Sequence, residues 1–224
     1  MKITGIYGHK DGQNYLERRH PDELSEVISV TESLNPAVAL TKQSSEKTKP
    51  PLLFSPVDMN DFLKTTLSPR GWTEPAPNSK KGFREPRIYL EGGREFREMD
   101  GIKNKVGLEI QFGKYAFMGY DIFSKMVIFS KRNLIDCGIE LVVMPSMISN
   151  MSTGVSSFTQ IVMDMRARGE ADLDIPTLIL GMEPTTEEWE EVEDKRDRFR
   201  KNKAELIANG EVSSGREGAK PGPK

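Results

Sequence analysis

The chain has 224 residues, of which 36% are hydrophobic and 29% charged, and its formal net charge is -2 at pH 7. This composition predicts one sizeable folded domain and excludes a protein that coats nucleic acid through its overall charge. The single cysteine, Cys137, excludes an intrachain disulfide framework, and its place before an apolar run predicts a buried strand residue.

The sequence also argues against a membrane protein and a zinc protein. No apolar stretch reaches the length of a membrane span, and the N-terminus lacks a signal-peptide core. We therefore expect no membrane partner and a cytoplasmic location. The two histidines, His9 and His20, lack the spacing of zinc ligands and are interpreted as structural or surface residues.

The first third of the chain is predicted to contain a strand followed by two helices. The strand is expected over residues 2–7, and the first helix has Pro21 in its first turn and apolar residues on one face. Residues 41–51 form a polar linker in this interpretation. Ser55 and Pro56 then begin the second helix, which ends at residues 68–71. Residues 72–86, rich in Pro, Lys and Asn, predict a loop or a frayed strand.

The side chains that could carry chemistry lie in residues 100–111. Apolar residues alternate with others over residues 106–112, which predicts a strand with one packed face and one wet face. Glu109 and Gln111 share the wet face, with Cα atoms about 7 Å apart. Residues 101–105 are short and polar enough to turn the chain back, so a hairpin is expected to bring Asp100 beside Glu109.

Two carboxylates and an amide in this arrangement could surround a hard divalent cation. Mg²⁺ prefers oxygen ligands and often takes only one or two protein carboxylates, here Asp100 and Glu109. Such a cation lowers the pKa of a bound water and stabilises charge on a phosphodiester, so the pattern indicates phosphodiester hydrolysis. Gln111 could orient the attacking water, but it is neutral and can act neither as a cation nor as a base. The alternative is a turn aspartate beside the exposed face of an ordinary antiparallel strand, which on spacing alone is the commoner structure.

The charge is unevenly distributed along the chain. Acidic residues are concentrated in residues 183–194, whereas basic residues surround residues 100–111. A local basic patch can neutralise phosphates in a chain that is acidic overall, although solvated side chains on a polar loop are the alternative for residues 80–87. The basic residues are Lys80, Lys81, Arg84, Arg87, Arg94, Arg97, Lys103, Lys105 and Lys114.

The second half of the chain is predicted to alternate helices with buried strands. Residues 115–131 predict a helix that is buried on more than one side. Residues 139–144 and 176–180 predict strands, the first of them central, and residues 156–168 a further helix. A long charged helix is expected over residues 185–209, with Thr186 as its cap.

Residues 108–115, Leu-Glu-Ile-Gln-Phe-Gly-Lys-Tyr, are the centre of a run that resembles the BglII/BstYI-type restriction endonucleases. That family belongs to the PD-(D/E)xK nuclease superfamily and has Gln in place of the usual Lys. The likeness looks closer to the BstYI branch. It extends to Ile-Tyr-Gly-His at 6–9, Ser-Glu-Lys-Thr-Lys-Pro at 45–50, Leu-Phe-Ser-Pro-Val at 53–57 and Met-Ser-Thr-Gly at 151–154.

The resemblance implies an α/β fold with a restriction-endonuclease-like core, in which helices flank a mixed central sheet. It implies an endonuclease domain over residues 1–181. Charge pattern and composition, rather than the resemblance, predict the charged helix over 182–209 and a disordered tail over 210–224. The implied activity is that of a type II restriction endonuclease. Such an enzyme depends on Mg²⁺ and acts as a homodimer that cuts both strands of a short palindromic site in double-stranded DNA, here a GATC-centred one.

Residue by residue, the resemblance implies that Asp100, Glu109 and the backbone carbonyl of Ile110 bind the metal and that Gln111 orients the attacking water. The implied DNA contacts are Lys114, Ser152 and Thr153, whose side chains can hydrogen-bond base edges. The alternatives are a phosphate contact or a surface position for the lysine and a turn-forming role for the two hydroxyls.

Two other functions stay open from the sequence. One is a repair or recombination nuclease that recognises DNA structure with the same centre. The other is a DNA-binding module that keeps the fold without turnover. Discrete bands at a common motif would distinguish a restriction enzyme from the first, and divalent-cation-dependent nicking would distinguish it from the second.

Overall fold

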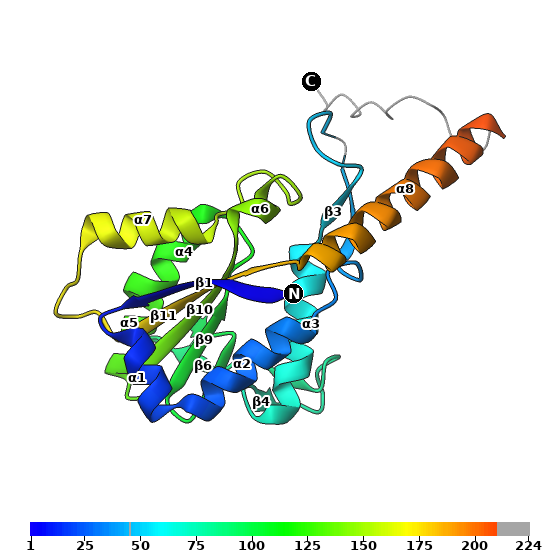
Figure 1. Ribbon diagram of the computed structural model, residues 1–224. Coiled ribbons are helices and arrows are strands. Elements are labelled where there is room, and N and C mark those ends of the chain that lie inside the picture. The colour runs from blue at the N-terminus through cyan, green and yellow to red at the C-terminus, as the bar shows by residue number, and fades with distance from the viewer. Residues whose placement is uncertain (45, 210–224) are drawn as a thin grey trace, which may run out of the picture.

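A five-stranded mixed sheet forms the centre of the molecule (Figure 1). The computed structural model describes residues 1–44 and 46–209, so the tail expected over residues 210–224 lies outside the described residues. The two middle pairs of strands are parallel and the two outer pairs antiparallel, as the predicted mixed sheet requires. In spatial order the strands are β1 (Lys2–His9), β11 (Thr177–Glu183), β10 (Cys137–Val143), β9 (Val106–Ile110) and β8 (Gly101–Lys103).

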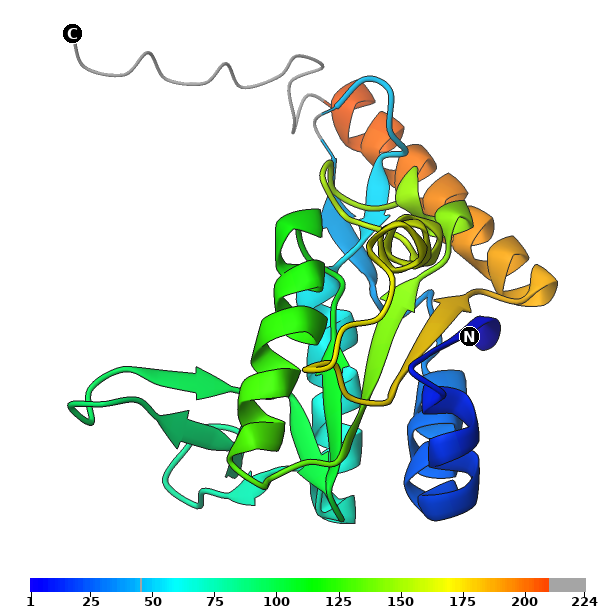
Figure 2. The same cartoon turned by 90° about the vertical axis from the view of Figure 1, so that its left-hand side faces the viewer.

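Helices cover both faces of this sheet (Figures 1 and 2). The first face packs against α1 (Gly12–Arg19), α2 (Pro21–Ser33) and α3 (Pro56–Leu67). The second packs against α7 (Phe158–Arg168) and a continuous helix made of α4 (Tyr115–Tyr120), η2 (Asp121–Met126) and α5 (Val127–Lys131). The short helix α6 (Pro145–Ile148) follows β10 and packs Met147 into the core of the first face. The predicted α/β class is therefore confirmed.

The central strands are buried on both faces, which corrects the expected wet face of β9. Every residue of β9 and β10 is buried. The alternating apolar residues of β9 do face one core cluster, but the opposite face is covered as well. At Gly107 an added Cβ would lie 2.6 Å from Met99 Sδ and 2.9 Å from Ile135 Cδ1. The physical reason is that parallel strands in an α/β sheet carry helices on both sides.

Local sequence explains where the first helices begin and end. Pro21 opens α2, and Ser55 caps α3 by accepting a hydrogen bond from the backbone N–H of Asp58. A 3₁₀ turn, η1 (Ser68–Arg70), then ends the helix at Gly71, whose φ of 87° favours glycine. The sequence did not predict α1, because a short helix with Leu16 as its one large buried side chain has little amphipathic pattern.

Three short hairpins lie outside the central sheet. The first joins both ends of the predicted linker, and the second falls in the segment expected to be a loop or a frayed strand. The third extends from the body as an arm (Figure 2). The pairs are β2 (Leu40–Gln43) with β3 (Leu52–Phe54), β4 (Glu74–Pro75) with β5 (Phe83–Arg84), and β6 (Arg87–Tyr89) with β7 (Phe96–Glu98).

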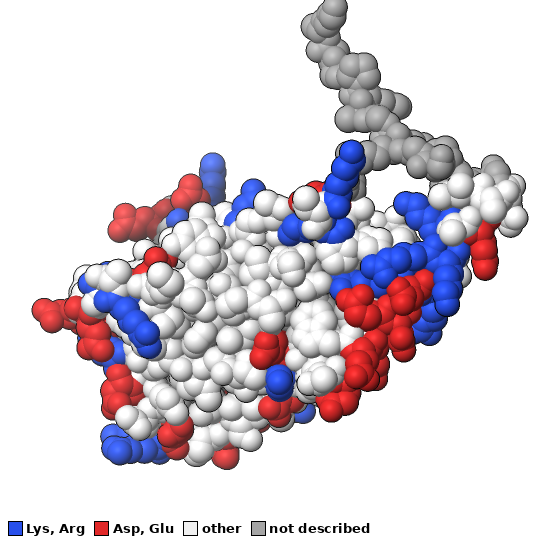
Figure 3. All heavy atoms as spheres, turned by 45° about the horizontal axis from the view of Figure 1, so that its top comes forward, with Lys and Arg blue, Asp and Glu red and all other residues white. Residues whose placement is uncertain are grey.

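The long helix α8 (Thr186–Ala208) begins on the body and projects beyond it (Figures 1 and 2). Its cap is Thr185, one residue before the predicted Thr186. Arg196, only 2% exposed, fastens it by donating to the carbonyl of Leu52 at 3.0 and 3.2 Å. Most of its acidic side chains lie in its first half and most of its basic ones in its second half (Figure 3). In the part of the chain that the structure describes, neither α8 nor any other helix combines the length and apolarity needed to span a bilayer.

Candidate active site

Asp100 and Glu109 are brought together as predicted, by a hairpin that differs in detail from the expected one. Residues 101–103 form β8, which pairs with β9, and the chain turns at Asn104 and Lys105, with φ of 46° and 70°. Asp100 therefore lies just before the hairpin, and its Oδ2 accepts a hydrogen bond of 2.7 Å from the backbone N–H of Ile110.

The parallel pairing of β9 with β10 places a second glutamate, Glu140, directly beside Glu109. Glu140 is fully buried, and neither of its carboxylate oxygens has a hydrogen-bond partner. Burial raises the pKa of Glu140 well above its ordinary value, and the charge of Asp121 raises it further. Glu109 is 3% exposed, and burial together with the neighbouring Asp100 raises its pKa in the same way.

The helical segment η2 contributes an acid and a base to the same place. Lys125 Nζ lies 2.8 Å from Glu109 Oε1 and 2.7 Å from Asp121 Oδ1. Burial alone would lower the pKa of Lys125, but these two carboxylates raise it above its ordinary value, so the ammonium form is favoured. The pKa of Asp121 is raised, chiefly by burial.

Gln111 is held at both ends of its amide. Its Nε2 donates a hydrogen bond of 2.9 Å to Asp121 Oδ2, and its Oε1 accepts one of 2.9 Å from the backbone N–H of Gly113. A carbonyl oxygen has two lone pairs, so Oε1 keeps the capacity to accept a second hydrogen bond. This geometry suits a side chain that orients a polar molecule rather than one that exchanges a proton.

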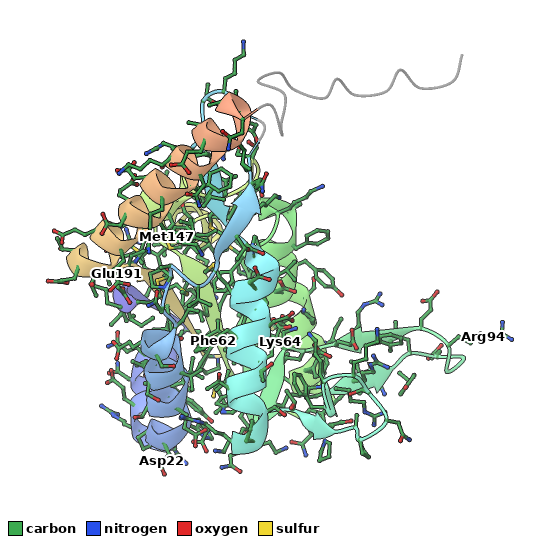
Figure 4. All side chains as sticks on the ribbon, turned by 90° about the vertical axis from the view of Figure 1, so that its right-hand side faces the viewer. Asp22, Phe62, Lys64, Arg94, Met147 and Glu191 are labelled. Carbon is green, nitrogen blue, oxygen red and sulfur yellow. The ribbon has the colours of Figure 1, made fainter. Side chains whose placement is uncertain are left out.

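These side chains surround an open pocket of about 300 Å³. Helix α3 contributes Asn60 to its lining, and the buried Oδ1 of Asn60 has no hydrogen-bond partner. Lys64 lies on the same helix (Figure 4). Lys64 Nζ lies 2.6 Å from Asp100 Oδ1 and 3.0 Å from Glu85 Oε1. The pocket is lined by Asn60, Asp100, Glu109, Ile110, Gln111, Phe117, Tyr120, Asp121 and Lys125.

The donor set of this pocket suits a hard cation. Among the described residues no group of three or more His, Cys, Asp or Glu side chains is placed to hold a metal ion. Mg²⁺, however, often takes only one or two protein carboxylates and completes its shell with water and phosphate. Glu109 Oε1 is buried, and Lys125 Nζ lies 2.8 Å from it. Asp100, Glu109 and the carbonyl of Ile110 therefore remain a chemically fitting set of oxygen donors.

The three residues expected to contact DNA lie close together in the fold. The backbone of Lys114 forms a β-bridge with Val155, next to the loop that contains Ser152 and Thr153. The two hydroxyls are engaged by the β2–β3 hairpin: Lys42 Nζ donates to Ser152 Oγ at 2.6 Å, and Thr153 Oγ1 donates to an oxygen of Glu46 at 2.9 Å. Together these residues form one partly exposed polar surface. That this surface contacts the bases of DNA stays a prediction.

The basic residues expected around the centre do not form a continuous phosphate patch. Arg94 lies at the tip of the β6–β7 arm, far from Lys64 on α3 (Figure 4). Several of the others pair with carboxylates of the protein, because residues that are neighbours in sequence separate in short hairpins. The pairs are Lys81 with Asp61, Arg84 with Glu74, Arg87 with Glu98 and Lys103 with Glu26.

The sequence reasoning missed four residues of this centre: Lys64, Asp121, Lys125 and Glu140. Three of them had a visible signal. Asp121 and Lys125 are an acid and a base four positions apart within an otherwise largely apolar predicted helix. Glu140 interrupts the apolar run of β10, where an unpaired carboxylate is costly and therefore informative.

The family described as restriction endonuclease BglII/BglIII matches residues 4–182. The chain belongs to this family. It is accordingly a restriction endonuclease, a site-specific deoxyribonuclease, as the resemblance of residues 108–115 predicted.

Solved structures of BglII share the fold. A crystal structure of restriction endonuclease BglII complexed with a DNA 16-mer has a TM-score of 0.62 and 19% sequence identity, covering 83% of this chain and 79% of that one. A crystal structure of free BglII has a TM-score of 0.57 and 18% identity, covering 83% and 81%. No protein of curated function matches the sequence. The closer likeness to the BstYI branch stays a prediction.

Proposed function

We propose that this restriction endonuclease hydrolyses both strands of a short palindromic duplex DNA site, centred on GATC, in a reaction that depends on Mg²⁺. The observation that supports this proposal most is the convergence of Asp100, Glu109 and Gln111 on one open pocket. Two carboxylates with an adjacent backbone carbonyl suit Mg²⁺, and the opening leaves room for a phosphate.

In this mechanism Asp100, Glu109 and the carbonyl of Ile110 would hold the metal ion. When bound, Mg²⁺ lowers the pKa of the attacking water and stabilises negative charge on the scissile phosphate. The backbone N–H of Ile110 holds Asp100 in place through a 2.7 Å hydrogen bond. Two hydrogen bonds fix Gln111, so its free lone pair can hold the attacking water in line with the phosphorus. Because Gln111 does not titrate, the proton of that water passes to solvent or to a phosphate oxygen of the substrate.

The partner proposed is double-stranded DNA, gripped by a homodimer in the cytoplasm. One of the structures that share the fold is BglII in complex with DNA. A closed two-fold dimer suits a palindrome, because each subunit then meets the same sequence on its own strand. Lys114, Ser152 and Thr153 are proposed to contact base edges from their shared surface.

The proposal assigns residues 1–181 to the endonuclease domain and residues 182–209 to an appended charged helix. The family match, which ends at residue 182, supports this division. The buried guanidinium of Arg196 and the carbonyl of Leu52 nevertheless join α8 to the domain.

The test is cleavage of genomic DNA of known sequence, with sequencing of the ends produced. We expect ends at one palindromic motif containing GATC, in the presence of Mg²⁺ and not in EDTA. Cutting that follows flaps or junctions would replace the proposal with a structure-specific nuclease. Tight duplex binding with no nicking in Mg²⁺ or Mn²⁺ would replace it with a binding module.

A further inference from the structure

Lys125 occupies a position in the active-site pocket that the mechanism above does not use. Its side chain is 14% exposed, and its ammonium group bridges Glu109 Oε1 at 2.8 Å and Asp121 Oδ1 at 2.7 Å. Among the residues that the structure describes, it is the one cation that lines this pocket. The other nearby lysine, Lys64, is taken up by Asp100 and Glu85 on the α3 side.

The chain adopts an unusual conformation at this point. Asp121–Met126 is a π-helical segment between two α-helical ones, and it contains both members of the ion pair. Such segments are rare, and they are frequent at functional sites. The segment directs Asp121 and Lys125 toward the sheet, where one carboxylate oxygen of Asp121 meets Lys125 and the other meets Gln111.

The electrostatics of the pocket call for a cation at this place. Asp100, Glu109 and Asp121 all line it, and uncompensated carboxylates would repel an approaching phosphodiester. Hydrolysis also adds negative charge to the phosphoryl oxygens in the transition state, which fixed positive groups stabilise. Gln111 is neutral and cannot provide this charge.

We infer that Lys125 is a catalytic residue of this enzyme, which supplies the fixed positive charge beside the scissile phosphate that Gln111 lacks. The inference rests on the proposed function. Asp121 is a positioning residue in this scheme, because it holds Lys125 with one oxygen and Gln111 with the other. The competing explanation is that the ion pair only fastens the helix to the sheet.

The geometry allows a test in which the positive charge is moved from position 125 to position 111. Gln111 Nε2 lies 2.9 Å from Asp121 Oδ2, so an amine introduced at position 111 would reach the carboxylate that now holds Lys125. The experiment compares wild type with Lys125→Met, Lys125→Arg, Gln111→Lys and the double variant Gln111→Lys/Lys125→Met. The control, Lys131→Met, removes a lysine from the exposed end of the same continuous helix.

Three quantities are measured for each variant: the single-turnover cleavage rate at saturating enzyme, the Kd for a duplex site in EDTA, and the melting temperature. We expect Lys125→Met to lower the rate by about 100-fold or more, the size of effect seen when one transition-state contact is removed. Its Kd in EDTA should rise several-fold because Glu109 and Asp121 then lack the cation that Lys125 supplies. Lys125→Arg should retain more activity than Lys125→Met, and the double variant should cleave at least about 10-fold faster than Lys125→Met. The control should match wild type.

Other results would overturn the inference. One is a cleavage rate of Lys125→Met within about 3-fold of wild type. Another is a loss of cleavage by Lys125→Met that its unfolded fraction fully explains. The third is a double variant that cleaves no faster than Lys125→Met. If Lys125→Met fails to fold, Lys125→Arg decides: a folded variant without cleavage contradicts a role that needs only positive charge. Absence of cleavage by the wild-type protein would instead reject the proposed function, so the two failures are distinguishable.

Discussion

Two clusters of buried charged residues in this protein differ in how completely hydrogen bonds and ion pairs stabilise their carboxylates. Beside the amino end of β11, Asp174 accepts hydrogen bonds from both Arg168 nitrogens at 2.6 and 2.9 Å and from the Ala171 N–H at 2.9 Å, and it lies 2.9 Å from His9 Nε2. Burial alone would raise the pKa of Asp174, but the Arg168 guanidinium and the Ala171 N–H hold it well below its ordinary value.

In the proposed active-site cluster burial outweighs the stabilising partners, so the pKa values of the carboxylates are raised rather than lowered. The pKa values of Glu109, Asp121 and Glu140 are all raised, chiefly by burial, and Glu140 has no hydrogen-bond partner at all. Satisfied carboxylates stabilise a fold, whereas unsatisfied ones cost stability and mark sites where a ligand completes the structure. We therefore interpret the Asp174 cluster as structural and keep the cluster around Glu109 as the proposed functional one.

The largest expected effect is on cleavage by variants of the functional cluster. Asp100→Asn and Glu109→Gln should each lower the cleavage rate by about 1000-fold or more, since each removes a proposed metal ligand. Specific duplex binding should remain measurable by mobility shift. The melting temperature of Glu109→Gln should not fall, because burial and the neighbouring Asp100 charge already disfavour the ionised form of Glu109. A variant that cut plasmid DNA at the parental rate would show that the assignment of the metal site is wrong.

Substitution in the Asp174 cluster should lower stability and leave cleavage unchanged. Asp174→Asn should lower the free energy of unfolding by about 3 kcal/mol, because it leaves the partners of a buried carboxylate unpaired. The cleavage rate per folded molecule should stay unchanged. Urea titration and single-turnover cleavage measure the two quantities, with Asp172→Asn, at an exposed position, as the matched control. Equal stability of both variants would remove the distinction between the clusters.

Acid should weaken the same cluster selectively. The folded-state pKa of Asp174 is lowered, so its contribution to stability is complete above the unfolded-state pKa and is lost as the pH falls through the folded-state value. The stability difference between wild type and Asp174→Asn should therefore be full at pH 7 and shrink below about pH 4. Urea titrations at several pH values measure this difference. A difference that stayed constant down to pH 3 would contradict the ion-pair explanation.

The smallest effect is expected at Glu140. Because burial strongly favours its neutral acid, which an amide resembles in size and polarity, Glu140→Gln should change the free energy of unfolding by less than about 1 kcal/mol. Thermal unfolding near neutral pH measures the change. A loss as large as that of Asp174→Asn would mean that Glu140 is charged and bound by the protein after all.

Much of the scaffold could be predicted from local patterns. The strand around Glu109, the capped helix after Ser55 and the apolar run before Met144 are each specified by adjacent residues, and each was found. Helix α1 and the β2–β3 hairpin were missed because tertiary packing, rather than sequence pattern, maintains such short elements.

The residues of the candidate site likewise divide into those that the sequence could predict and those that it could not. Asp100, Glu109 and Gln111 lie within twelve residues of sequence, so a hairpin argument could unite them. Glu140 joins them only through the parallel register of β9 and β10, and Lys125 only through the phase of a helix with a π-helical segment. Neither relationship is readable from one sequence, because both depend on where separate elements pack.

The loop with Ser152 and Thr153 differs from the strand of Glu109 in how it can accept change. The strand lies between β10 and β8 and is buried along its whole length, so almost any substitution there disturbs the core. The loop is fastened instead by surface hydrogen bonds to Lys42 and Glu46 of a separate hairpin. Under the proposed function, a change of the loop together with the hairpin could alter which DNA sequence the enzyme prefers. The residues that hydrolyse the DNA would stay the same.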